Sequence, residues 1–76
     1  MGGHSFSVVL FASVQMAIRA ERLLQGAGLE VKLIPVPRQL SSDCGVCLRF
    51  DGTQATEVEE ILENHGVPLE GIYRLP

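Results

Sequence analysis

The chain has 76 residues, of which 46% are hydrophobic and 20% are charged, and its formal net charge is -3. A chain of this length supports one hydrophobic core, so we expect a single domain over residues 1–76. The acidic balance and the scattered basic residues argue against nucleic-acid binding, which needs clustered Lys and Arg. The sequence also offers no basic helix that would bind a membrane surface.

The first predicted strand runs from Ser5 to Ala12, a segment rich in Val, Phe and Leu. No Lys or Arg precedes it and it is too short to span a bilayer, so we interpret it as a buried strand and not as a signal peptide. Residues 1–4 are expected to be disordered. We therefore expect a cytoplasmic protein, in which two cysteines are reactive or metal-binding more often than joined in a permanent disulfide.

A helix is predicted next, from Val14 to Gln25, with Ser13 as its N-cap. The alternating segment Leu29 to Val36 predicts the second strand, which Pro35 and Pro37 end or confine to a sheet edge.

After a polar, turn-rich segment, a third strand is predicted from Val46 to Phe50. Alternation places Leu48 and Phe50 on one face of it and Cys47 and Arg49 on the other.

Asp51-Gly52 predicts a turn, and Thr53 is the expected cap of a second helix that ends near Asn64. A short last strand is predicted from Ile72 to Leu75. The order βαββαβ predicts an α/β (α+β sandwich) fold of the ferredoxin-like split βαβ type. In that fold both helices cover one face of a four-stranded antiparallel sheet.

The opposite sheet face is expected to present an apolar patch made by Val9, Phe11, Ile34 and Tyr73. Such a patch on a small protein predicts a homodimer or another partner docked there. Two alternatives stay open: the alternation is misphased, or the C-terminus folds over the patch.

The main chemical signal is the sequence Cys44-Gly45-Val46-Cys47. Two cysteines at this spacing can hold one metal, exchange one disulfide or pass a sulfur atom between them, and Gly45 lets the backbone turn so that both sulfurs face one point. Nearby residues should affect a Cys44 thiolate in opposite ways. The carboxylate of Asp43 opposes it. The hydroxyl groups of Ser41 and Ser42 and the positive charges of Arg38 and Arg49 favour it.

Three alternatives compete with a reactive pair. Small cysteines also fill cores, which suits Cys47 in its strand better than Cys44 in its polar loop. Cys44 and Cys47 from two chains would give a four-thiolate zinc site that staples a dimer. A reversible Cys44–Cys47 disulfide would make the protein a thiol redox enzyme or sensor.

The two histidines are weaker candidates. His4 lies in Met1-Gly2-Gly3-His4, which chelates copper or nickel only at a processed, unblocked terminus. His65 is expected at the C-terminus of the second helix, and its alternative role is a base near Cys44.

The stretch from Leu33 to Arg38, followed by Leu40 to Phe50 with Ser41-Ser42-Asp43-Cys44-Gly45-Val46-Cys47, resembles a small bacterial and archaeal family of unknown function described as "putative selenium/sulfur carrier protein-like". Phe11-Ala12-Ser13 and Gly71-Ile72-Tyr73 extend the resemblance over nearly the whole chain. Better-known sulfur-relay carriers place Cys-Pro at a helix start, so their mechanism does not transfer to Cys-Gly in a loop.

The leading hypothesis is a carrier of activated sulfur or selenium and not a turnover catalyst. Cys44 accepts the chalcogen from a donor enzyme, and Cys47 resolves the intermediate toward an acceptor protein. Arg38, Arg49 and the loop amides stabilise the added negative charge. No cofactor is expected; zinc belongs to the alternative.

Overall fold

The computed structural model describes residues 5–40 and 45–76, so the predictions made for residues 1–4 lie outside the described residues. The described chain follows the predicted βαββαβ order, with one 3-10 turn (η1) inserted before the second helix. The elements are β1 (Phe6–Leu10), α1 (Val14–Gly26), β2 (Val31–Pro35), β3 (Val46–Asp51), η1 (Gly52–Gln54), α2 (Ala55–Asn64) and β4 (Gly71–Arg74).

The four strands form one sheet in the order β2-β3-β1-β4, and every neighbouring pair is antiparallel. Strands β1 and β2 therefore run in the same direction with β3 between them, and β3 and β4 do so with β1 between them. The predicted small α+β domain with a four-stranded antiparallel sheet and two helices is confirmed. Its assignment to the ferredoxin-like class stays a prediction. Pro35 lies on β2, an edge strand, as its missing N–H requires.

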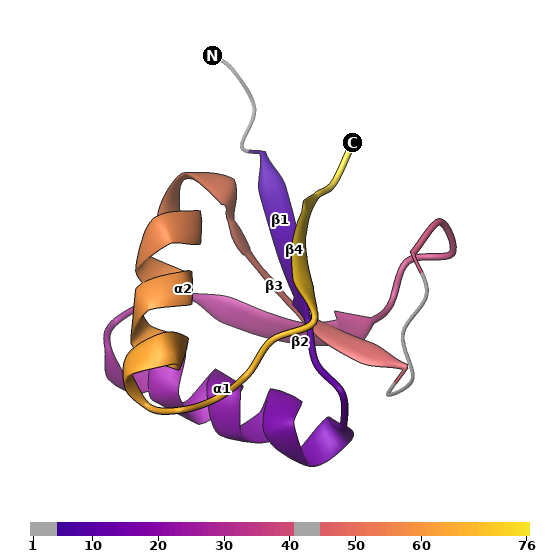
Figure 1. Ribbon diagram of the computed structural model, residues 1–76. Coiled ribbons are helices and arrows are strands. Elements are labelled where there is room, and N and C mark those ends of the chain that lie inside the picture. The colour runs from indigo at the N-terminus through magenta and orange to yellow at the C-terminus, as the bar shows by residue number, and fades with distance from the viewer. Residues whose placement is uncertain (1–4, 41–44) are drawn as a thin grey trace.

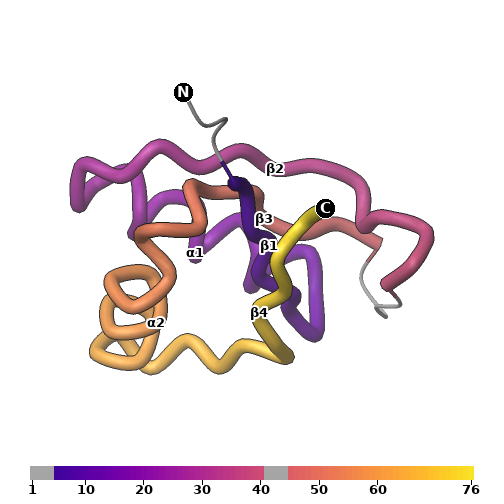
Figure 2. The backbone as a smooth tube through the Cα atoms, turned by 90° about the horizontal axis from the view of Figure 1, so that it is seen from above, coloured from indigo at the N-terminus to yellow at the C-terminus, as the bar shows by residue number. Residues whose placement is uncertain are grey.

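Both helices cover the same face of the sheet, and in Figure 1 α1 lies at the bottom of the view and α2 at the left. Figure 2 shows the same arrangement from above. The main core fills the space between the helices and the sheet, and apolar side chains from every strand and both helices contribute to it. Its fully buried members include Val9, Phe11, Ala17, Leu24, Leu48, Phe50, Val58 and Leu62.

Helix α1 begins where the sequence predicts. The Ser13 Oγ accepts a hydrogen bond from the Met16 N–H at 3.2 Å, which satisfies one of the unpaired donors of the first turn. The helix continues to Gly26, one residue beyond the prediction.

The start of α2 corrects the prediction that Thr53 is its cap. An Asp51 carboxylate oxygen accepts hydrogen bonds from the Thr53 N–H at 2.9 Å and from its Oγ1 at 2.8 Å. Thr53 thus lies inside η1, which Asp51 caps, and α2 begins at Ala55. Both residues are good capping types, and an Asp side chain reaches the N–H two residues ahead, so the chain forms the earlier cap.

The phase of β1 is also corrected. Val9 and Phe11, predicted on the sheet face opposite the helices (the open face), are fully buried in the core beneath the helices. Val8 and Leu10 lie on the open face instead, in a second apolar cluster with Cys47. Residues 8 to 11 are all apolar, because this central strand is buried on both faces, and so the sequence contained no alternation from which to set the phase.

An apolar cover lies over this second cluster. The cover consists of Val36 and Leu40, from the segment after β2, which pack against it together with Ile34 of the open face. Leu75 packs against the same cluster beside Phe6, at the end of β1 away from Leu10 and Cys47, where its N–H donates to the Phe6 carbonyl at 2.8 Å. The alternation was therefore misphased, whereas Leu75 continues the pairing of β4 beside β1 and does not fold over the sheet. The homodimer through this face stays a prediction.

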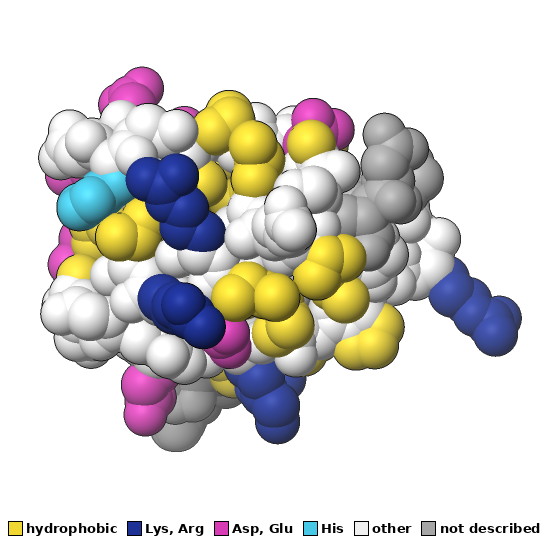
Figure 3. Space-filling model, turned by 90° about the horizontal axis from the view of Figure 1, so that it is seen from below, with side chains coloured by type: hydrophobic (Ala, Val, Ile, Leu, Met, Phe, Trp, Pro, Cys, Tyr) yellow, Lys and Arg dark blue, Asp and Glu magenta, His cyan; other side chains and the backbone are white. Residues whose placement is uncertain are grey.

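The exposed large hydrophobic side chains divide between two faces. Phe6 on β1 and Tyr73 on β4 lie on the open face of the sheet. Val14 and Ile18 lie one turn apart on α1. Figure 3 views the molecule from the side that α1 covers and shows apolar side chains there beside basic ones. None of the helices in the described ranges has the length and apolar character to cross a membrane.

Candidate functional site

The predicted thiol pair belongs to the hairpin of β2 and β3. At the base of its loop the Val36 N–H donates to the Gly45 carbonyl at 3.1 Å, and the Leu40 N–H donates to the Pro37 carbonyl at 3.0 Å to form a turn. Cys44 and its predicted supporting residues Ser41, Ser42 and Asp43 lie outside the described residues. The described hairpin therefore fixes the chain immediately after Cys44.

Gly45 has a φ of +76°, in the left-handed region that side chains with a Cβ rarely adopt. The chain turns at Gly45 into the strand that carries Cys47. The predicted use of this glycine as a turning point is thus seen in its backbone. The convergence of the two sulfurs stays a prediction.

Cys47 is buried in β3, with an exposed fraction of 0%. Its register partners are Leu10 on β1 and Ile34 on β2, and the apolar cover lies above it. This environment fits the alternative in which Cys47 fills a core position. It also means that a large reagent reaches the sulfur only if the cover moves.

The two arginines predicted to support Cys44 have different surroundings. Arg38 is exposed in the turn after Pro37. Arg49 lies two residues beyond Cys47, and its guanidinium carbon is 4.4 Å from the centroid of the Phe6 ring. Phe6 pairs with Asp51, at the end of β3 away from Cys47. The contact of Arg49 is thus a cation–π interaction, and its effect on Cys44 stays a prediction.

His65 occupies the C-cap of α2, as one of its two interpretations expects. Its Nδ1 lies 3.0 Å from the Ile61 carbonyl oxygen of its own helix, and Arg19 of α1 donates to the His65 carbonyl at 3.4 Å. In Figures 1 and 2 the turn after α2 lies well away from the start of β3. The described contacts of His65 therefore join the two helices and give no support to a base near Cys44.

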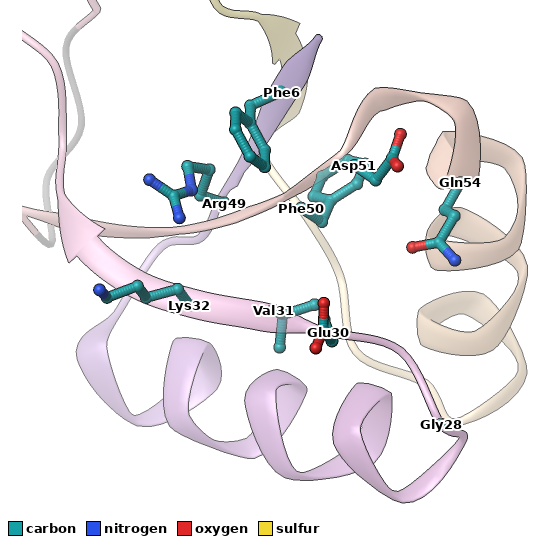
Figure 4. A pocket seen from close by; sticks show the side chains of 9 residues that line it. All are labelled: Phe6, Gly28, Glu30, Val31, Lys32, Arg49, Phe50, Asp51 and Gln54. Carbon is teal, nitrogen blue, oxygen red and sulfur yellow. The ribbon is translucent and has the colours of Figure 1, made fainter. Parts of the chain in front are cut away.

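A hollow that the sequence reasoning missed lies at the other end of the β2–β3 hairpin (Figure 4). It has a volume of about 370 Å³ and is lined by the first residues of β1 and β2 and the last residues of β3. Lys32 and Arg49 are direct register partners across β2 and β3. Hairpin register could have placed these two charged residues together, but the contributions of Phe6 and Gln54 depend on the tertiary fold.

Of the two cysteines that the zinc alternative needs, the structure describes Cys47 but not Cys44. In residues 5–40 and 45–76, no group of three or more His, Cys, Asp and Glu side chains is close enough to hold a metal ion. A site shared by two chains would use Cys47, whose sulfur the apolar cover shields. That alternative thus requires the open face to rearrange.

A family model described as "Putative Se/S carrier protein-like" matches residues 6–74, which include the whole Cys-Gly-Val-Cys segment and all of the sheet. No curated protein and no solved structure matches the chain. The match agrees with the resemblance seen in the central hairpin sequence.

Proposed function

The chain belongs to the Se/S carrier protein-like family, and on that basis we propose that it carries activated sulfur or selenium on Cys44, with Cys47 as the resolving thiol. The observation that carries the proposal is the family match, because it spans the hairpin with both cysteines. A donor enzyme and an acceptor protein are the partners that such a carrier needs.

Loading is a transfer of sulfane sulfur without net oxidation. The Cys44 thiolate attacks the outer sulfur of the donor's persulfide, a new S–S bond forms on Cys44, and the donor's S–S bond breaks. The donor leaves as a thiolate, so atoms and electrons balance. With selenium, the corresponding transfer forms an S–Se bond on Cys44.

Release follows by attack of the Cys47 thiolate on the Cys44 sulfur. The outer sulfur leaves as sulfide with two more electrons, and Cys44 and Cys47 become a disulfide. A dithiol reductant then restores both thiols. Cys47 is buried next to Val36 and Leu40, so this step requires the apolar cover to open, as the zinc alternative does, and Cys44 lies three residues away in the sequence.

The hairpin supplies the proposed environment of the loaded thiol. Arg38 is exposed beside the loop, and the base of the loop is fixed by the hydrogen bond between Val36 and Gly45. We expect Arg38, Arg49, the Ser41 and Ser42 hydroxyls and the Gly45 amide to stabilise negative charge on Cys44, and Asp43 to oppose it.

Native mass spectrometry of the protein purified without reductant or chelator tests the proposal against the zinc-stapled dimer. We expect a sulfur or selenium adduct that maps to Cys44. Stoichiometric zinc that is lost together with a dimer would contradict the carrier and make both cysteines structural. A Cys44–Cys47 disulfide that no persulfide can load after reduction would point to a redox protein.

A further inference from the structure

The hollow at the start of β2 is lined by basic side chains at one end and acidic side chains at the other. Lys32 and Arg49 face each other across β2 and β3, and Val8 is the partner of Arg49 on its other side. Like charges directly opposite each other are unfavourable in a sheet, and neither register partner of Arg49 is an acid. Within the described residues, Lys32 and Arg49 thus form a cationic end of the hollow.

The other end of the hollow is acidic and polar. Glu30 comes immediately before β2, Asp51 ends β3, and Gln54 belongs to η1. The Asp51 carboxylate is held in place by the N–H and hydroxyl of Thr53. Figure 4 shows Lys32 and Arg49 extending on one side of the hollow, and Asp51 and Gln54 on the opposite side.

An aromatic surface lies between the two ends. Phe6 is 38% exposed, and the guanidinium carbon of Arg49 lies 4.4 Å from the centroid of its ring. Val31 and Phe50 complete the apolar part of the lining. The volume of about 370 Å³ is within the range of small-molecule sites, roughly 300–1,000 Å³.

Two cations and two carboxylates give the lining a formal charge of zero, so neither a simple anion nor a simple cation complements it. We propose that this hollow binds a small zwitterion of the α-amino-acid class. Its carboxylate contacts Lys32 and Arg49, its ammonium group faces Glu30 and Asp51, and its apolar side chain packs on Phe6. This inference goes beyond the carrier function and does not depend on it.

Titration of the full chain with L-leucine, followed by amide NMR shifts, tests the proposal. L-leucine should produce saturable shifts centred on the amides of Val31, Lys32 and Arg49. Leucinamide lacks the carboxylate charge and N-acetyl-leucine lacks the ammonium charge, so each should bind about tenfold more weakly. Equal binding of all three compounds, or no saturable shift with L-leucine, would overturn the proposal.

An exchange of two charges provides a matched variant. Glu30→Lys combined with Lys32→Glu reverses the charge order along the start of β2 while composition and net charge stay the same, and both side chains are exposed. We expect about tenfold weaker binding of L-leucine. Arg22→Gln, on the exposed surface of α1 and outside the hollow, should leave the affinity unchanged. Unchanged binding in the exchanged variant would overturn the assignment of the two ends.

Discussion

Val36 donates its backbone N–H to the Gly45 carbonyl at 3.1 Å, and this bond ties the residue after β2 to the residue that follows Cys44. Val36 also packs in the cover over Cys47. Val36 therefore has two roles: its backbone closes the base of the hairpin loop, and its side chain helps to bury Cys47. Movement of Val36 would change the access to Cys47 and the hydrogen bond to Gly45 together.

Replacement of Gly45 by Ala should lower the free energy of unfolding by about 1 kcal/mol, because its φ of +76° is strained for a residue with a Cβ. Denaturant unfolding measures the change. Gly26→Ala is the control: it sits at the end of α1, where an added Cβ meets nothing within 4 Å. Equal effects of the two substitutions would show that the turn at Gly45 does not need its conformation.

Cys47 should react slowly with a bulky maleimide in the native protein, since the apolar cover leaves its side chain with no exposed surface. Cys44→Ser isolates this thiol, and mass spectrometry counts the labels with and without denaturant. The denatured Cys44→Ser variant sets the rate expected without the cover. Fast labelling of native Cys44→Ser would mean that the cover opens readily.

Loss of the N-cap of α1 should lower the stability of the protein, and a substitution at a second serine serves as the control. Ser13→Ala removes the acceptor of the Met16 N–H and should cost about 1 kcal/mol of unfolding free energy. Ser5→Ala changes an exposed serine at the other end of β1, and thermal unfolding should show a smaller effect. An unchanged Tm for Ser13→Ala would contradict the capping role.

The contact between Arg49 and Phe6 can be measured by a double-mutant cycle with Arg49→Gln and Phe6→Leu. At a partly exposed site we expect a coupling free energy of about 0.5–1 kcal/mol from denaturant unfolding. A coupling near zero would show that the two side chains contribute independently.

The sequence predicts the elements with strong periodicity correctly. In β3, Leu48 and Phe50 alternate with Cys47 and Arg49, and the structure places the two sets on opposite faces as predicted. In β1, residues 8 to 11 are all apolar, so nothing in the sequence could reveal that Val9 and Phe11 turn toward the helices. Phase is readable only where one sheet face differs chemically from the other.

The start of the second helix and the burial of Cys47 could not be predicted from local sequence. Asp51 and Thr53 both have capping side chains, and the choice between them is made by the backbone of η1. The burial of Cys47 depends on the packing of Val36 and Leu40 against the open face, which is set only in the folded protein. The role of Cys44 still rests on its sequence context and on the family match.

The most direct test of the carrier function is intact-mass analysis of the reduced protein after incubation with cysteine persulfide, followed by mapping of the adduct. We expect a persistent adduct of one sulfur on Cys44 in Cys47→Ala, because the resolving thiol is missing, and no loading of Cys44→Ser. The unaltered protein should show either this adduct or the Cys44–Cys47 disulfide that its release leaves. Circular dichroism of each variant checks that the fold is retained. Loading of a folded Cys44→Ser variant, or the absence of an adduct on a folded Cys47→Ala variant, would contradict the carrier function.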